Sequence, residues 1–433
     1  MNDSFHTRRE FLRKGIYFVA ASATAPFFLT RTALALDSLA ANSPTRGLPG
    51  VVDDRILVVI QMSGGNDGLN TIVPHAMDEY YKLRPTLGVG KKSLLKLDDT
   101  VGFHPGLAKV KDLYDSGKVA VIHGVGYQNP DRSHFRSMEI WHTADPKSKA
   151  VSYGWLGRYL DSACPGCDPR TKKINPMGGI NIGGDMPVAM KSAKGVSIAL
   201  ENPDSFKWQP LIDEKSDAKN ASATYEKLNH IVASNLDDPQ IARLDFLSRV
   251  AMNADVSSDK IHDISKRTRS GGTYPATGLG NQLKIVAQMI TGGLNTRIYY
   301  VAFSGFDTHA NEPGTHERLL AELADEVSAF QKDLEARDQA SRVLTMTFSE
   351  FGRRVAQNAS NGTDHGTAAP MFIFGDHLKA GVYGKHPSLT DLDRGDLKFN
   401  TDFRSVYATV LENWLGAKSA PILGQQFEKL KFV

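Results

Sequence analysis

The sequence predicts a mixed α/β protein with a mostly parallel central sheet and helices on both of its faces. Several short apolar runs rich in Val, Ile and aromatic residues have the length of buried strands. Stretches with helical spacing separate them, which is the order typical of a parallel sheet. The chain of 433 residues is 41% hydrophobic and 23% charged, which is typical of a globular protein with a large core.

The first predicted strand is Arg55–Met62, and it ends in the glycine-rich loop Ser63–Asn70. Glycines at a strand end let the backbone turn sharply and approach a ligand closely. Asp67 is therefore expected at the mouth of the sheet. A helix over Leu107–Ser116 and a second strand over Val119–Val125 follow.

Further strands are expected downstream, and each ends in a polar loop. The second strand is followed by the loop that carries Ser133 and by helices from about Met138 and over Gly154–Asp161. The later expected elements are a helix over Leu283–Thr291, a strand over Arg297–Phe303, a helix over His316–Ala336, strands over Val343–Phe348 and Met371–Gly375, and a closing helix over Asp402–Gly416.

The N-terminal residues have the pattern of an export signal. The paired arginines Arg8 and Arg9 precede the apolar run Gly15–Leu29 and a small-residue site near Ala35. This pattern predicts a twin-arginine signal peptide over residues 1–35, a linker over 36–53 and one domain over 54–433. The apolar run is too short and too interrupted for a stable membrane span. We therefore expect the twin-arginine export machinery as a partner and a periplasmic or secreted location.

Two further features limit the possible partners and ligands. The net charge is +3, and no block of Lys and Arg alternates with aromatics, so nucleic acid is not an expected partner. The pattern weakens over about 164–280, which we interpret as an insertion, largely helical over Thr224–Met252. Cys164 and Cys167 lie in this range and are expected as a disulfide or as free thiols rather than as half of a zinc site.

Acids, histidines and one serine follow the predicted strands at the points where these strands end. Ligands bind at the carboxyl ends of strands in open α/β sheets, so these side chains are expected to share one cleft. Acids gathered in a cleft need compensation, and divalent metal ions are the usual means. The candidate residues are Asp67, Ser133, Asp307, His309, Glu350, Asp364 and His365.

Several motifs together resemble one known family. These motifs are GGNDGLN from Gly64, RSHFRSMEIW from Arg132, GFDTH from Gly305, SEFGR from Ser349, GTDHGTAAP from Gly362 and DFRSVYATVLENWLG from Asp402. The chain resembles the domain of unknown function 1501 family, which consists of exported bacterial proteins within the alkaline phosphatase and sulfatase-like superfamily. The resemblance implies an alkaline phosphatase-like fold that carries two divalent metal ions at its strand ends.

The resemblance also implies roles for individual residues. Asp67 matches the first metal-binding aspartate, Ser133 the nucleophile, Asp307 with His309 the middle metal pair, and His365 the late histidine. For the remaining Asp-His pair, two alignments compete. In one, Glu350 is the ligand and Phe351 replaces the histidine. In the other, Asp364 and His365 form the pair, and His377 or His386 supplies the late histidine.

The resemblance implies a metal-dependent hydrolase of phosphate or sulfate esters that uses Zn, Mn, Mg or Ca ions. Metal contact would activate the hydroxyl of Ser133, and Arg132, Arg136 or Arg353 would hold the anionic oxygens. His134 and His142 are general-acid candidates, although a structural role suits His142 better. The alternative is a non-catalytic exported protein that retains the fold and a partial metal site for binding or assembly.

Overall fold

The computed structural model of this chain describes residues 54–147, 153–163, 177–193, 197–204, 206, 257–268 and 271–433. The predicted signal peptide, the linker, the helix over 224–252 and both cysteines lie outside the described residues. The predictions made for them therefore stay predictions.

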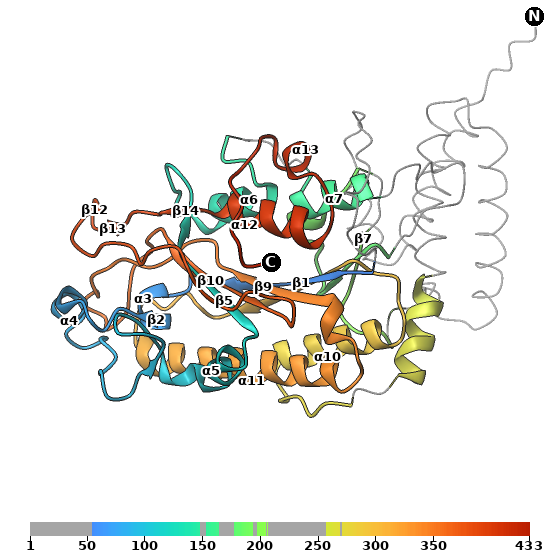
Figure 1. The fold of residues 1–433 in the computed structure, drawn as a ribbon, viewed down its shortest axis with the longest axis horizontal. Helices are drawn as coiled ribbons and strands as arrows, with labels where there is room; N and C mark the ends of the chain where they lie inside the picture. The colour runs from blue at the N-terminus through green and yellow to red at the C-terminus, as the bar shows by residue number, and fades with distance from the viewer. Residues whose placement is uncertain are drawn as a thin grey trace, which may run out of the picture.

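A nine-stranded sheet forms the centre of the fold, with the strand order β11-β5-β10-β9-β1-β8-β6-β7 and β14 beside β5 (Figure 1). All of its pairings are parallel except those of β10, which runs against both β5 and β9. The strands are β1 (Ile56–Ser63), β5 (Val119–Gly126), β6 (Gly179–Ile182), β7 (Ser197–Leu200), β8 (Ile298–Ser304), β9 (Val343–Phe348), β10 (Ala369–Phe374), β11 (Gly381–Tyr383) and β14 (Thr401–Asp402).

Side chains on alternate positions of the central strands enter two separate hydrophobic cores. On β1, Ile56, Val58 and Ile60 belong to one core, whereas Leu57 and Val59 belong to the other. Successive strand residues point to opposite faces, so both faces of β1 are covered. This is why the strand is apolar along nearly its whole length.

Helices cover both faces of the sheet, as Figure 1 shows. On one face lie α5 (Ala108–Asp115), α10 (Gly278–Thr291) and α11 (Glu312–Glu335). On the other face lie α6 (His134–Thr143), α7 (Trp155–Ala163), α12 (Phe403–Thr409) and α13 (Ser419–Leu423), and α12 continues into a π-helical turn over Val410–Trp414.

Smaller elements flank the loops at one end of the sheet. A three-stranded sheet joins β2 (Ile72–Val73), β4 (Gly102–Phe103) and β3 (Leu95–Lys96). The short helices α3 (Gly68–Thr71) and α4 (Asp78–Leu83) precede and follow β2 in the chain. A hairpin pairs β12 (Leu392–Asp393) with β13 (Asp396–Leu397).

The predicted fold class is confirmed: a mostly parallel central sheet lies between two layers of helices. The five strands expected from apolar runs are all present, within two residues at each end. The structure differs from the prediction in two places. β6 and β7 extend the central sheet from within the range 164–280 that was interpreted as an insertion. In addition, α6 begins at His134, four residues before the expected start.

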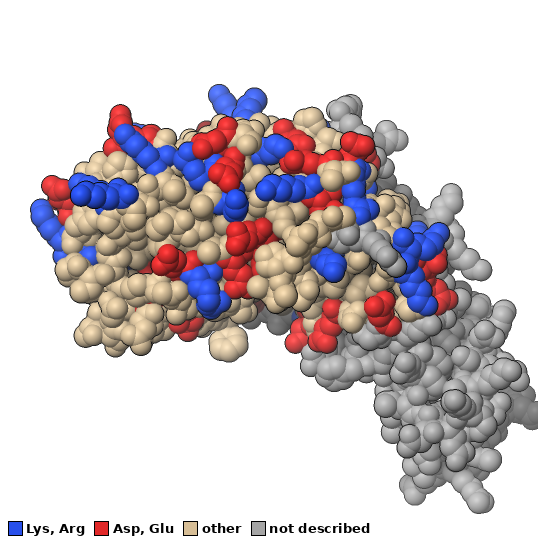
Figure 2. All heavy atoms as spheres, turned by 90° about the horizontal axis from the view of Figure 1, so that it is seen from below, with Lys and Arg blue, Asp and Glu red and all other residues tan. Residues whose placement is uncertain are grey.

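The surface charge is mixed (Figure 2), and the described helices include no candidate for a membrane span. On the face shown in Figure 2, acidic and basic side chains are interspersed among the other residues. Within the described ranges, none of the helices combines the length and the apolar character that crossing a membrane requires.

Candidate metal centre

The loops after β1, β8 and β9 meet at one edge of the sheet. Gly64 has a φ of +121°, and a Cβ atom there would lie 2.3 Å from the backbone nitrogen of Asp307. Only glycine permits this approach, because other residues would collide and rarely adopt such a φ. The glycine-rich loop after β1 therefore brings the loop that carries Asp307 close to the end of the first strand.

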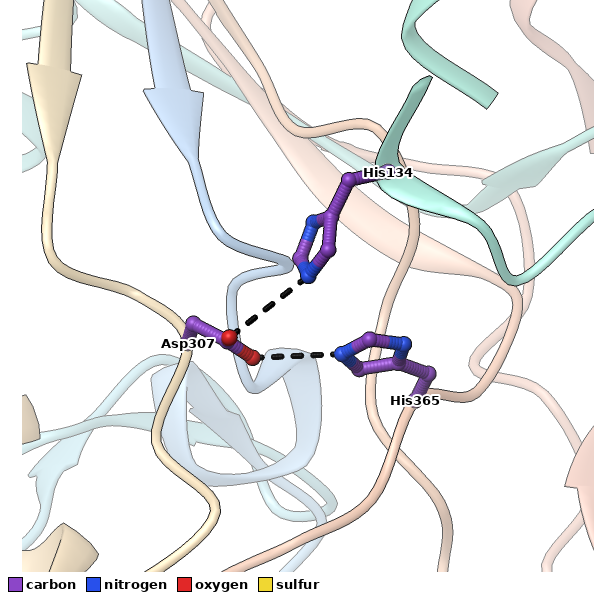
Figure 3. A group of neighbouring side chains, drawn as sticks. All are labelled: His134, Asp307 and His365. Carbon is purple, nitrogen blue, oxygen red and sulfur yellow. Dashed lines mark hydrogen bonds and ion pairs between the residues drawn. The ribbon is translucent and has the colours of Figure 1, made fainter. Parts of the chain in front are cut away.

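Three side chains from separate segments converge here: His134 at the start of α6, Asp307 and His365 (Figure 3). One nitrogen or oxygen atom from each lies within 4.8 Å of the others. His365 Nε2 is 3.1 Å from Asp307 Oδ1, and His134 Nε2 is 3.5 Å from Asp307 Oδ2. Two imidazoles and a carboxylate at these separations are a donor set that divalent metal ions use in proteins.

The other ring nitrogen of each of these histidines faces a hydrogen-bond acceptor. His365 Nδ1 lies 2.8 Å from the backbone oxygen of Arg132, and His134 Nδ1 lies 2.9 Å from Glu350 Oε1. A carbonyl oxygen can only accept, so Nδ1 of His365 carries the proton and donates it. In a neutral imidazole the lone pair is then on Nε2, which faces Asp307. Metal-binding histidines are commonly oriented by such an outer acceptor.

A third histidine, His309, lies beside this group. Its Nε2 is 3.1 Å from Asp307 Oδ1 and 2.9 Å from His365 Nε2. Its Nδ1 is 3.3 Å from Asp364 Oδ1. His309 thus repeats the arrangement of His134, with an outer carboxylate at Nδ1 and with Nε2 turned toward Asp307.

Glu350 and Asp364, the two competing ligand candidates, occupy equivalent positions behind different histidines. Glu350 is 2% exposed, and its Oε1 accepts hydrogen bonds from the Gly64 backbone nitrogen at 2.8 Å and from His134. Asp364 is exposed and faces His309. A hydrogen bond from Asn358 at 3.1 Å lowers the pKa of Asp364. Each acid therefore orients a histidine that faces Asp307.

Arg353 keeps Asp307 ionised and in place. Its Nη2 donates to Asp307 Oδ1 at 2.7 Å. Partial burial acts to raise the pKa of Asp307, but the hydrogen bond and charge of Arg353, together with His365 and His309, outweigh burial, and the pKa falls to about 2. Arg353 is 1% exposed, and it also donates to the backbone oxygens of Gly64, Gly65, Phe306 and Thr363. Its donors are thus used within the protein.

The remaining candidates near the cluster are Arg132 and Ser133. Arg132 forms an ion pair with the buried Asp396, while its backbone oxygen holds His365. Ser133 is exposed at the N-cap of α6, and its hydroxyl makes no capping hydrogen bond. Phe351 packs between the histidines, with its ring centroid 4.9 Å from that of His134 and 4.5 Å from that of His365.

Asp67 is engaged elsewhere. It is fully buried and caps α3, and its Oδ2 lies 2.5 Å from Arg84 Nη1, with both side chains fully buried. Burial acts to raise the pKa of Asp67, but the charge of Arg84 and the hydrogen bonds from Glu312 and Arg84 together outweigh burial and hold the pKa well below its usual range. The ion pair with Arg84 occupies the carboxylate that was expected at the first metal.

A buried network that the sequence did not suggest surrounds Asp67. Glu312 and His316, both on α11, are at most 1% exposed. Thr363 Oγ1 donates to Glu312 Oε2 at 2.6 Å, and His316 Nε2 lies 3.1 Å from Asn66 Oδ1. Burial and the nearby Asp67 raise the pKa of Glu312 to about 9, and burial lowers the pKa of His316 to about 3. Both side chains are therefore neutral at pH 7.

We expect Glu312 to make the protein less stable as the pH rises. Its folded pKa of about 9 exceeds the ordinary value of 4.5, so the folded state retains a proton that the unfolded state releases. The free energy of unfolding should therefore fall between about pH 4.5 and pH 9. Urea denaturation at pH 6 and pH 8.5 measures this fall, and Glu312→Gln should make it smaller. An unchanged pH dependence in Glu312→Gln would contradict the assignment.

The other histidines and arginines named from the sequence have separate partners. His142 is buried, and its Nε2 lies 2.9 Å from Gln61 Oε1 and 3.0 Å from the Tyr300 hydroxyl, which fits a structural role. His386 packs against His123 at 5.2 Å between ring centroids. Arg136 pairs with Glu139 at 2.7 Å.

Comparison with known proteins gives one family match and several similar folds. The family model described as "Protein of unknown function (DUF1501)" matches residues 54–415. A search of curated proteins found no match. Three solved structures show the range of structural similarity.

A protein of the alkaline phosphatase superfamily from Vibrio parahaemolyticus is 8% identical, with a TM-score of 0.35 and coverage of 92% of this chain and 77% of that one. The C-terminal periplasmic domain of EcEptC from Escherichia coli is 9% identical, with a TM-score of 0.38 and coverage of 90% and 92%. A sulfatase from Pseudoalteromonas sp. is 11% identical, with a TM-score of 0.36 and coverage of 86% and 68%. Similarity at this level carries no argument about activity.

Proposed function

Because this chain belongs to the DUF1501 family, whose description names no activity, we propose a function from its own residues: it is an exported, metal-dependent hydrolase of phosphate or sulfate esters. The observation that carries the proposal is the convergence of histidine Nε2 atoms on the Asp307 carboxylate. The proposal of export rests on Arg8 and Arg9. Cell fractionation tests it, by comparing where the original protein and the double variant Arg8→Lys, Arg9→Lys are found.

The residues present fit a metal ion. Burial lowers the pKa of His365, which favours its neutral form. Neutral His365 donates through Nδ1 to Arg132, so its Nε2 lone pair faces the ionised Asp307 at 3.1 Å. Two acceptors face each other at this distance, and a cation between them removes the conflict. His134, Asp307 and His365 would hold the ion, with His309 next to them. Imidazole-rich sites favour Zn over Mg or Ca, with Mn as an intermediate case.

A bound divalent ion supplies Lewis-acid stabilisation of the charge that develops on the ester oxygens. In the proposed reaction Ser133 Oγ forms a bond to phosphorus or sulfur while the bond to the ester oxygen breaks. The proton of the Ser133 hydroxyl goes to the departing ester oxygen, which leaves as the alcohol, and water then hydrolyses the seryl ester to release phosphate or sulfate. Ser133 stands at the N-terminus of α6, where the helix dipole favours an anion. Glu350 fixes the orientation of His134, and Arg353 holds Asp307 ionised.

The resemblance implied two metal ions, and the side chains support a proposal with one. The residues that the structure describes contain a single group of at least three converging metal-competent side chains. Asp67 is neutralised by Arg84, and Phe351 stands where the alignment with Glu350 expected a histidine. The same two observations favour the second candidate, a non-catalytic exported binding or assembly protein with a partial metal site.

The experiment that separates the two candidates combines metal analysis with an ester panel. We expect the mature protein to retain about one metal ion per chain and to hydrolyse at least one phosphomonoester, phosphodiester or sulfate ester. Ser133→Ala should abolish turnover while it leaves the metal content unchanged, because the hydroxyl supplies the nucleophile. The exposed Ser93 provides the matched control Ser93→Ala. Turnover that survives in Ser133→Ala would rule out the proposed nucleophile, and metal binding without any turnover would favour the binding protein.

Glu350→Gln is expected to weaken metal binding without abolishing it. The amide keeps the size of the side chain but removes the charge that supports His134 as a ligand. Loss of such an outer partner typically costs about 10- to 100-fold in metal affinity. Competition with a chelator measures the affinity. If Glu350 were itself a ligand, metal would be lost entirely, and if it had no role the affinity would not change.

A further inference from the structure

A cavity of about 320 Å³ lies next to the proposed metal centre and is not explained by it. Phe351 forms part of its wall, and the same ring packs against His134 and His365. The lining segment over 126–131 leads directly into Ser133, and Thr367 follows His365 by two residues. The cavity and the metal centre are therefore built from the same loops.

The wall combines aromatic side chains with polar ones. Tyr127, Trp141 and Phe351 are at most 3% exposed, so each contributes only the few atoms that face the cavity. Phe399 is half-buried, and Gly126 allows it to pack closely, since a Cβ at Gly126 would lie 2.9 Å from Cβ of Phe399. Aromatic surface of this kind binds rings through stacking and apolar contact.

Polar groups at the cavity are available to a ligand. The side-chain amides of Gln128 and Asn129 are exposed and make no hydrogen bond with any described residue. Asn129 has a φ of +56°, an uncommon conformation for a residue other than glycine. Strained backbone of this kind clusters at ligand-binding sites. The loop thus presents amide donors and acceptors at the cavity.

The charges at the cavity restrict what can bind. Asp131 and Asp393 contribute carboxylates, and Lys398 is paired with Asp391. Two carboxylates disfavour a ligand with several anionic groups. Exposed amides and carboxylates would be left without partners beside an alkyl chain, whereas they can hydrogen-bond to hydroxyl groups.

We propose that this cavity binds the alcohol part of the ester and that this part is a hydroxyl-bearing ring such as a pyranose. This inference rests on the proposed hydrolase function, which makes the cavity a substrate site. The hairpin β12–β13 supplies Asp393 and, next to it, Lys398 and Phe399. It is fixed by the pair of Arg132 with Asp396 and by the hydrogen bond from Thr367 Oγ1 to the Leu397 oxygen at 2.5 Å. The hairpin is therefore the element that sets specificity.

Binding of neutral probes tests the inference without turnover. The probes are methyl β-glucopyranoside, methyl β-galactopyranoside, p-cresol and 1-hexanol. Each is titrated into the mature protein and followed by ligand-observed NMR, before and after the protein is treated with a chelator. We expect saturable binding of at least one glycoside in both states, because the cavity residues do not depend on the metal. Saturation by p-cresol or hexanol without glycoside binding, or no saturation by any probe, would overturn the proposal.

Variants place the bound probe in the cavity. Phe399→Ala should raise the dissociation constant of the glycoside by about 3- to 10-fold, which is the value of one aromatic contact. Asn129→Gly retains the backbone conformation while it removes the amide, and it should also weaken binding. Phe427, half-buried beneath Arg404, provides the control Phe427→Ala, which should bind normally. Equal affinities in Phe399→Ala and the control would overturn the proposal. Glycoside binding by a protein without turnover would reject the hydrolase function and leave the binding site in place.

Discussion

Asp307→Asn is expected to remove the metal ion and all ester hydrolysis. Asparagine keeps the shape of the side chain but not the charge on which three histidine nitrogens converge. Loss of an outer partner alone costs about 10- to 100-fold in metal affinity, so loss of the central carboxylate should exceed about 100-fold. Metal content after dialysis and turnover with the best ester of the panel measure the effect.

A matched control uses another aspartate. Asp115 lies at the end of α5 and pairs with Lys111 on the surface, away from the cluster. Asp115→Asn should retain full metal content and activity. If Asp307→Asn remained fully loaded after dialysis, the metal would have to bind elsewhere, and the proposed centre would be rejected.

Arg84→Met is expected to destabilise the protein by about 3–5 kcal/mol, because it leaves the fully buried Asp67 without its counter-charge. Urea denaturation measures the free energy of unfolding. The second substitution Asp67→Asn removes the unpaired charge, so the double variant should recover part of the loss. Lys82→Met, on α4 and two residues before Arg84, has a side chain 71% exposed; it is the control and should change stability by at most about 0.5 kcal/mol. A loss in Arg84→Met no larger than in this control would show that Asp67 does not need its partner.

The fold was predictable because its strands are buried on both faces. Val58, Val59 and Ile60 on β1 form an unbroken apolar run, which is a strong signal for a strand in a helix-covered sheet. β6 and β7 have only four residues each, and runs of that length do not stand out from their surroundings. The start of α6 was placed four residues late, at about Met138, although Ser133 is a residue type that is common at N-caps; in the structure Ser133 takes that position without a capping hydrogen bond from its side chain.

The candidate site was partly visible in the sequence. Asp307, His309 and His365 follow strand ends, and the structure brings them within 3.1 Å of one another through the carboxylate of Asp307. The distinction between an acid that binds metal and one that orients a histidine depends on which atoms meet, as with Glu350 and His134. The spacing of residues along the sequence does not show which atoms meet. The pairing of Asp67 with Arg84 joins positions 17 residues apart without a helical or strand period between them.

The buried guanidinium of Arg353 has a consequence for the order in which the protein folds. It bonds to the backbone oxygens of Gly64 and Gly65, 289 and 288 residues away along the chain, and to that of Phe306, 47 residues away. Contacts between positions so distant in sequence form slowly, because the intervening chain must be ordered first. The pairing of β1 with β9 spans a similar separation, since Ile56 pairs with Val343, so we expect the Arg353 contacts to form with this pairing and not before it. We therefore expect a chain to acquire the proposed ion only after these distant segments have met.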